Sequence, residues 1–282
     1  MSNDDITRRN FVGMAAAGLA VGNAVAADAQ QQVVEKNVEI KTPDGTCDAA
    51  FIHPAAGAHP AVIIWPDAFG LRQSMRDLGK RLAAESGYSV LVVNPFYRVA
   101  KGTVYPNAST VDFAAERAKL TPLMGSIGAA GTVEKDAPAF VAWLDSQPQV
   151  DKTKKIGTQG YCMGGALVVR TAAAVPDRIG AGGSFHGGGL VTAAPTSPHL
   201  LAPKIKARMY FGIAANDDMS APDAKVKLKE AFDAAKVPVE VEVYPNAQHG
   251  WCVPDMPGGL YAKADAERAW GKLIALYKAG LV

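Results

Sequence analysis

Residues 160–165 read Gly-Tyr-Cys-Met-Gly-Gly and place Cys162 at the centre of a glycine-flanked segment. An apolar approach over residues 155–159 predicts a strand before it, and the alanine- and valine-rich run Ala166–Ala174 predicts a helix after it. Glycines permit a tight turn and let such a helix pack close to the strand. The cysteine would stand at a helix N-terminus, whose unpaired N–H groups favour a thiolate. The pattern predicts a nucleophile at a strand-to-helix turn; the alternative is a buried cysteine beside glycines that only serve the turn.

The rest of the chain alternates strand-like and helix-like segments. Residues 61–65 are apolar throughout, which is typical of a strand buried on both faces of a parallel sheet. Further strands are expected at 88–93, 179–185, 207–213 and 239–244, helices at 72–85, 132–144, 222–236 and 260–279, a hairpin over 33–53, and a loop with a helix lying over the sheet at 98–131. The alternation predicts the α/β class, with a mostly parallel sheet and helices on both faces. Functional residues are then expected at the carboxyl ends of the strands.

The composition limits the kinds of protein that this chain can be. Its 282 residues, 49% of them hydrophobic, suffice for one globular domain, which we expect over residues 30–282. A formal net charge of +2 without a clustered basic stretch argues against nucleic acid as a partner. The three cysteines are too few for a disulfide scaffold, and no C-x-x-C or His/Cys cluster indicates a metal site. We expect a domain that holds no metal.

The first 29 residues have a different character. Arg8 and Arg9 precede a weakly hydrophobic run, residues 13–25, and two small-x-small sites follow at 24–26 and 27–29. This pattern resembles a twin-arginine export signal that is cleaved after Ala29; the alternative is a disordered or loosely helical tail. The apolar run is too short and too mild for stable insertion into a membrane. The sequence therefore predicts the twin-arginine export machinery as a partner and a periplasmic location for the protein.

An aspartate and a histidine, whose side chains suit acid–base catalysis, follow two of the predicted strands. Asp217 comes just after the strand 207–213, and His249 comes just after the strand 239–244. A histidine accepts the proton of a nucleophile efficiently when a carboxylate holds its other ring nitrogen. With Cys162, the order is nucleophile, acid, base, which is the order of α/β-hydrolases and differs from those of chymotrypsin and subtilisin. We expect a catalytic triad with Asp217 as the acid, while Asp218 is the alternative acid or caps the helix that opens near residue 222.

These segments together resemble one enzyme family. The elbow at 160–165, Ser-Phe-His-Gly-Gly at 184–188, Asn-Asp at 216–217, and Tyr-Pro at 244–245 followed by His-Gly-Trp at 249–251 look like the dienelactone hydrolase family. The similarity extends from about residue 35 to the C-terminus. It implies the α/β-hydrolase fold and hydrolysis of an enol-lactone or related ester through an acyl-cysteine intermediate, without a cofactor.

The resemblance also implies roles around the nucleophile. In the family an acidic residue, typically glutamate, follows the first buried strand and contacts the resting cysteine, and the matching residue here is the shorter Asp67. The alternative for Asp67 is a turn or helix-capping aspartate. The backbone N–H groups of Met163 and, by family position, Ala68 are expected to form the oxyanion hole.

The predicted substrate pocket differs from the best-known pattern of the family. Members that act on dienelactone hold its carboxylate with two arginines; Arg98, slightly shifted in register, is the candidate for the first, and no arginine follows directly after His249. The alternative interpretation of Arg98 is a solvated loop residue that binds no substrate. Phe69 and Trp251 favour an apolar or aromatic group in the substrate. Cys252 is expected as a buried free thiol, with a disulfide to Cys162 as the alternative.

Three functions follow from this sequence. The first is a hydrolase acting on a small-molecule lactone or ester with Cys162, Asp217 and His249 as its triad. The second keeps the fold and acts as a thioesterase or a peptidase. The third is a non-catalytic periplasmic binding protein that retains a hydrolase pocket, although binding alone needs none of the three triad groups.

Overall fold

The computed structural model describes residues 31–282, so the predicted export signal at 1–29 lies outside the described residues. Within this range eight strands form one sheet in the order β1-β2-β4-β3-β5-β6-β7-β8. Their bounds are Val33–Thr42 for β1, Gly45–Pro54 for β2, Ala61–Trp65 for β3, Ser89–Val93 for β4, Ile156–Tyr161 for β5, Ile179–Phe185 for β6, Arg208–Ala214 for β7 and Val239–Tyr244 for β8. The pairs β1–β2 and β2–β4 are antiparallel, and all other neighbours are parallel. The predicted hairpin and the mostly parallel sheet are both confirmed.

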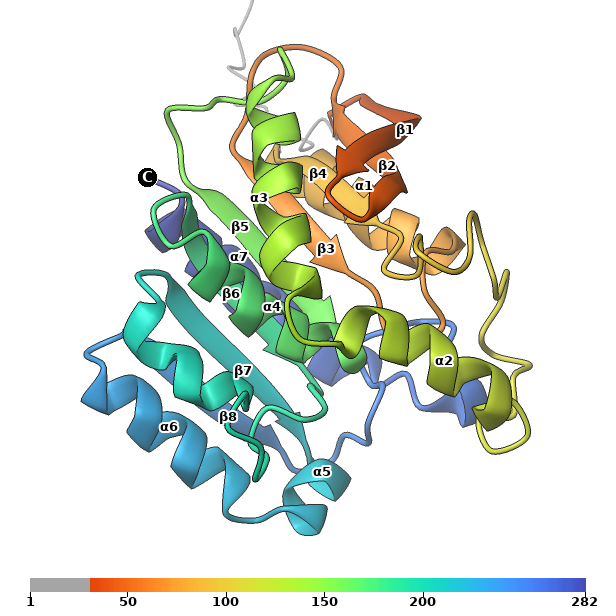
Figure 1. The fold of residues 1–282 in the computed structure, drawn as a ribbon, viewed down its shortest axis with the longest axis vertical. Helices are drawn as coiled ribbons and strands as arrows, with labels where there is room; N and C mark the ends of the chain where they lie inside the picture. The colour runs from red at the N-terminus through yellow and green to blue at the C-terminus, as the bar shows by residue number, and fades with distance from the viewer. Residues whose placement is uncertain (1–30) are drawn as a thin grey trace, which may run out of the picture.

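Helices cover both faces of this sheet (Figure 1). Their bounds are Gln73–Ser86 for α1, Arg117–Gly128 for α2, Thr132–Asp145 for α3, Met163–Ala174 for α4, Ala215–Ser220 for α5, Ala224–Ala234 for α6 and Lys263–Gly280 for α7, with short 3-10 turns at Pro198–Lys204 (η1) and Pro257–Gly259 (η2). In Figure 1, α3, α4 and α6 lie on the face toward the viewer, while α1 and α7 lie behind the sheet. No helix between residues 31 and 282 combines the length and the apolar character that crossing a membrane requires.

The central strands explain why the chain folds around them. Every residue of β3 and of β4 is buried, because these strands have neighbours on both sides and helices on both faces. The edge strand β1 is largely half-buried or exposed. Burial of such apolar strands contributes the largest favourable term of folding.

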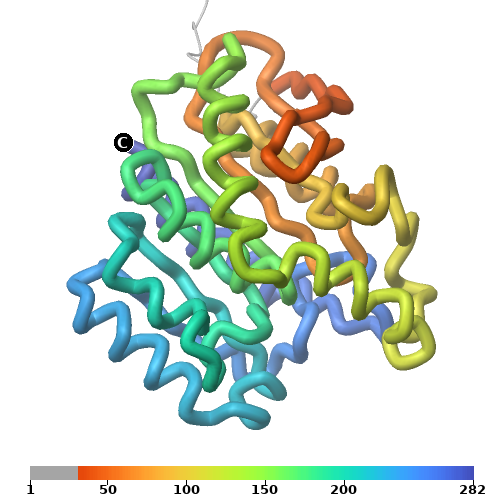
Figure 2. The backbone as a smooth tube through the Cα atoms, in the orientation of Figure 1, coloured from red at the N-terminus to blue at the C-terminus, as the bar shows by residue number. Residues whose placement is uncertain are grey.

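The parallel strands bring their carboxyl ends to one edge of the sheet. The tube in Figure 2 shows the chain leaving β5, β7 and β8 along this same edge, although the three segments are far apart in the sequence. The residues that follow these strands are Cys162, the segment 215–218 and the segment 245–249. The fold therefore collects the predicted chemical groups in one region.

Candidate active site

Cys162 occupies a strained turn between β5 and α4. Its φ is 52° and its ψ is −115°, a backbone conformation that a residue with a side chain rarely adopts. The glycines make the turn possible: a Cβ on Gly164 would lie 2.3 Å from the carbonyl oxygen of Trp65, and one on Gly160 would lie 2.2 Å from that of Gly164. Strain of this kind costs about 1–3 kcal/mol and is typical of functional sites. The predicted sharp turn with cysteine at its apex is present.

Asp217 and His249 meet at the same edge. Nδ1 of His249 lies 3.0 Å and 2.8 Å from the two carboxylate oxygens of Asp217. Asp218 instead pairs with Lys225 at 2.7 Å, so the structure separates the two aspartates. Asp217 lies on the short helix α5, where the sequence predicted a loop. This helix presents the carboxylate to the histidine.

Asn216, which belongs to the Asn-Asp segment of the family resemblance, is a further residue of this region for which no role was predicted. Its side-chain oxygen accepts a hydrogen bond from the backbone N–H of His249 at 2.8 Å. Helix α5 thus holds both the backbone and the ring of His249. The only signal in the sequence was its position next to Asp217.

The surroundings of His249 favour its charged form. Burial opposes the imidazolium, but the hydrogen bond with Asp217 and the neighbouring Cys162 side chain outweigh it and raise the pKa of His249 to about 10. Because Nδ1 faces Asp217, Nε2 is the ring nitrogen left for Cys162. The arrangement suits proton transfer between a thiol and an imidazole.

The sequence predicts that the backbone N–H groups of Met163 and Ala68 form an oxyanion hole. Within the part of the chain that the structure describes, no hydrogen bond is recorded from the N–H of Met163, the first residue of α4, or from that of Ala68. The first N–H groups of a helix have no partner within the helix. The close approach of Gly164 to the carbonyl groups of Trp65 and Pro66 brings the loop after β3 against the start of α4. The predicted role of these two donors stays a prediction.

Cys162 opens into a cavity of about 740 Å³. Its walls come from α4, from the junction of α2 and α3, and from the segment that leads into η1. Apolar groups such as Met124, Ala166 and Leu201 line it, together with the ion pair of Arg170 and Glu134. The cavity can hold an organic molecule with an apolar body next to the thiol.

Asp67 lies in a buried ion-pair network. Its two oxygens accept hydrogen bonds from Arg72 at 2.7 Å and 2.9 Å, and one of them also accepts the N–H of Phe69 at 2.9 Å. Arg72 in turn donates to both oxygens of Asp255 at 2.8 Å. Among residues 31–282 the structure records no hydrogen bond between Asp67 and Cys162. The contact with Phe69 is the turn-capping alternative, and modulation of the thiol stays a prediction.

The structure does not bring the three predicted substrate-binding side chains to the cavity beside Cys162. Arg98 is held by Asp44 at 2.9 Å and Asp136 at 2.7 Å, which occupy its guanidinium donors, so it is neither a carboxylate clamp at this cavity nor a freely solvated residue. Phe69 is buried against Tyr105. Trp251 is fully buried and packs against His186 and Tyr244.

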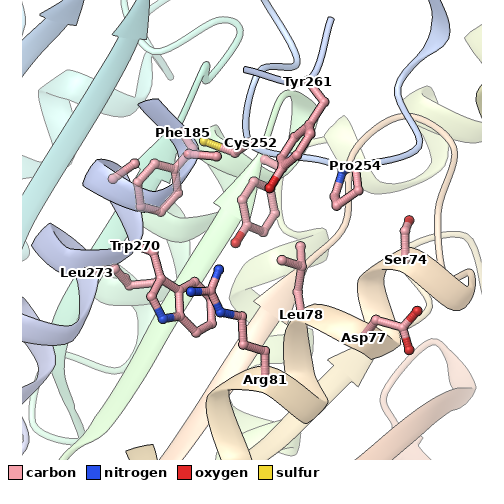
Figure 3. Close-up of a pocket in the computed structure, with 13 residues that line it drawn as sticks. Ser74, Asp77, Leu78, Arg81, Phe185, Cys252, Pro254, Tyr261, Trp270 and Leu273 are labelled. Atoms are coloured by element: carbon pink, nitrogen blue, oxygen red, sulfur yellow. The ribbon is translucent and has the colours of Figure 1, made fainter. Parts of the chain in front are cut away.

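Cys252 lines a different cavity, of about 280 Å³, between α1 and α7 on the opposite face of the sheet. Figure 3 shows its sulfur beside Phe185, with Tyr261 and Trp270 along the same walls. All three cysteines are free, which confirms the expectation of a buried free thiol at Cys252. Burial raises the pKa of this thiol well above its usual range, so it is a poor nucleophile.

Comparison with known proteins places the chain in a family. The model of the dienelactone hydrolase family matches residues 47–281. The chain is 29% identical over 233 residues to a Synechocystis protein named "Putative carboxymethylenebutenolidase", covering 80% of this chain and 89% of that protein. It is 24% identical over 241 residues to the carboxymethylenebutenolidase of Rhodococcus opacus, covering 84% and 88%.

A solved structure allows the fold itself to be compared. The structure of a dienelactone hydrolase-like promiscuous phosphotriesterase from metagenomic libraries superposes with a TM-score of 0.72 at 23% identity, covering 89% of this chain and 99% of that chain. At this level of identity the likeness concerns the fold alone. Family match and fold agree, and the chain belongs to the dienelactone hydrolase family as a carboxylic ester hydrolase with the α/β-hydrolase fold.

Proposed function

We propose that this hydrolase cleaves a small lactone or carboxylic ester through a triad of Cys162, His249 and Asp217. The observation that carries the proposal is the contact of both Asp217 oxygens with His249 Nδ1, at an edge where Cys162 forms the strained turn. Three groups in the order of an α/β-hydrolase triad, with the acid oriented toward the base, have no comparable use in a binding protein.

The proposed reaction proceeds in two halves. Nε2 of His249 holds the proton of the Cys162 thiol, so Sγ attacks the carbonyl carbon as a thiolate, and the N–H groups of Met163 and Ala68 stabilise the oxyanion. The tetrahedral intermediate collapses, the leaving oxygen takes the proton from His249, and an acyl-cysteine thioester remains. Water then gives a proton to His249 and attacks the thioester, which releases the acid and restores the thiol.

The cavity supports a substrate with an apolar body. Its volume of about 740 Å³ exceeds what a single small lactone ring fills, and its walls include Met124, Ala166 and Leu201. With Arg98 engaged by two aspartates, the substrate carboxylate lacks the arginine partner that the family resemblance suggested. We therefore propose an uncharged ester or lactone with an aliphatic or aromatic group beside the carbonyl.

The deciding experiment compares two cysteine variants. Cys162→Ala is expected to abolish hydrolysis of uncharged aryl esters and lactones, while Cys252→Ala, which removes the buried thiol closest in sequence to His249, keeps it. Intact mass after an acid quench should show an acyl adduct in the wild type and in Cys252→Ala only. Turnover by Cys162→Ala at the wild-type rate would refute the cysteine mechanism.

A substrate panel separates the competing functions. Lactone, aryl ester, thioester and peptide substrates are compared by kcat/KM; highest values for thioesters or peptides would move the proposal to a thioesterase or a peptidase. Failure of a stoichiometric dose of iodoacetamide to label Cys162, with no turnover of any substrate, would favour the binding protein instead.

We also propose that residues 1–29 export the folded enzyme to the periplasm by the twin-arginine route. The support is sequence only: Arg8 and Arg9 before a mild apolar run, and a small-x-small site that ends at Ala29. N-terminal sequencing of periplasmic material is expected to begin after Ala29. Replacing both arginines by lysine should leave the protein in the cytoplasm, and an intact Met1 in the periplasm would contradict the proposal.

A further inference from the structure

His186 lies directly beside the proposed triad, immediately after β6. It is fully buried, and its φ of 40° is one of three positive values among the described residues that are not glycine; Cys162 has another. Its backbone N–H donates to the carbonyl of Gly212 at 2.8 Å, which holds the strained conformation in place. Two strained residues in contact indicate a region where function, rather than stability, selects the conformation.

The ring of His186 holds the backbone of the nucleophile. Nδ1 accepts a hydrogen bond from the N–H of Cys162 at 3.1 Å, and this N–H is shared with the backbone carbonyl of Phe185, also at 3.1 Å. An accepting Nδ1 carries no proton, so the neutral ring bears its hydrogen on Nε2. Burial, and then the nearby charge of His249, lower the pKa of His186 well below its usual range, which keeps the ring in this accepting form. The contact fixes the peptide group from which the thiol projects.

The same ring also packs against the catalytic histidine. The centroids of His186 and His249 lie 4.9 Å apart with an edge-to-face angle of 64°, and Trp251 lies against His186 at 5.3 Å. Trp251 in turn stacks on the buried Tyr244 at 4.5 Å, so His186 is linked through Trp251 to the hydrophobic core. This packing limits the orientations that the His249 ring can take.

Stability alone does not account for a histidine here. Nε2 of His186 is buried and has no hydrogen-bond partner among the described residues. An unpaired buried polar group costs free energy that an apolar ring of similar shape would avoid. The hydrogen bond that Nδ1 accepts from Cys162 explains why this position holds a histidine and not an apolar ring.

We propose that His186 is a positioning residue for the reaction: its Nδ1 fixes the amide of Cys162, and its ring keeps Nε2 of His249 directed at the thiol. This inference rests on the proposed function, because it assigns a role in the cysteine mechanism. It extends that mechanism to a residue that touches both reacting groups without being a reacting group itself.

Two substitutions separate the two contacts. His186→Phe keeps an aromatic ring against His249 but removes the acceptor, whereas His186→Asn keeps an acceptor near the position of Nδ1 and tolerates a positive φ. For the phenylalanine variant we expect kcat to fall by about 100-fold with KM little changed, as displacement of a reacting group by a fraction of an ångström does. The asparagine variant should lose less activity than the phenylalanine variant, because it keeps the acceptor and lacks only the ring against His249, and the rate of Cys162 alkylation by iodoacetamide should follow kcat in both.

Controls keep the test decisive. Circular dichroism and thermal unfolding establish that the variants fold, and His186→Gly, which suits the positive φ, replaces the phenylalanine variant if that one does not. A wild-type kcat in a folded variant without the acceptor overturns the inference, as does equal loss in the asparagine and phenylalanine variants. Cys162→Ala distinguishes the two failures: if it is inactive while His186→Phe is fully active, only the role of His186 is wrong, whereas an active Cys162→Ala refutes the cysteine mechanism itself.

Discussion

Nδ1 of His249 lies within 3.0 Å of both carboxylate oxygens of Asp217, and this contact determines how the imidazole can act. With Nδ1 engaged, Nε2 is the nitrogen that can exchange a proton with the Cys162 thiol. The neighbouring Asp218 makes its own ion pair with Lys225 and takes no part in this contact.

The two aspartates should therefore differ sharply when each is replaced by asparagine. In the proposed mechanism Asp217→Asn leaves the imidazole in the wrong tautomer, a change that costs about 10⁴-fold in kcat in a serine triad. Asp218→Asn breaks only a partly exposed ion pair and should retain nearly full activity. Steady-state kcat/KM on an aryl ester checks this, and equal losses in the two variants would contradict the assignment of Asp217.

The raised pKa of His249 predicts a pH-dependent contribution to stability. The pKa is about 10 in the folded protein against the usual 6.5, so the contribution is fully present below pH 6.5 and is lost as the pH rises through about 10. The difference in unfolding free energy between the wild type and His249→Gln should thus be larger at pH 6 than at pH 10.5. Urea denaturation at both pH values measures it. A difference that stays constant or grows with pH would show that the folded protein does not stabilise the imidazolium.

Arg72 should be among the residues least tolerant of substitution. Its side chain is fully buried and holds Asp67 and Asp255 together. Arg72→Met leaves two carboxylates without their cation, and breaking a buried pair in this way costs about 3–5 kcal/mol. Lys229→Met, which removes an exposed ion pair with Asp233, should cost less than about 1 kcal/mol. Urea denaturation compares the two, and similar losses would mean that the buried network contributes no more than a surface pair.

The tight turn at Cys162 predicts that replacing glycine by alanine lowers stability much more in this turn than elsewhere in the chain. In Gly164→Ala the new Cβ would meet backbone oxygens that cannot move aside easily, so we expect destabilisation of about 3 kcal/mol together with loss of activity. Gly125, within α2, has open space around its Cα, and Gly125→Ala should be neutral or stabilise by up to about 1 kcal/mol. Thermal unfolding of both variants tests this; a fully stable Gly164→Ala would show that the loop after β3 is not held against α4.

Much of the fold could be predicted because its signals are local. The apolar run that became β3 and the alternating hairpin that became β1 and β2 carry their period in the sequence itself. Helix α5 could not be predicted, because a one-turn helix has too few residues for a period. The same limit applies to the 3-10 turns η1 and η2.

The sequence by itself determined the chemical types at the site and their order along the chain. Cys162, Asp217 and His249 each follow a strand, and parallel strands must bring those positions to one edge. Only the tertiary structure decided which groups touch: Asp217 rather than Asp218 reached the histidine, Arg98 was taken up by Asp44 and Asp136, and His186 came to lie against Cys162. Such contacts depend on side-chain directions across elements far apart in sequence, and local periodicity carries no information about them.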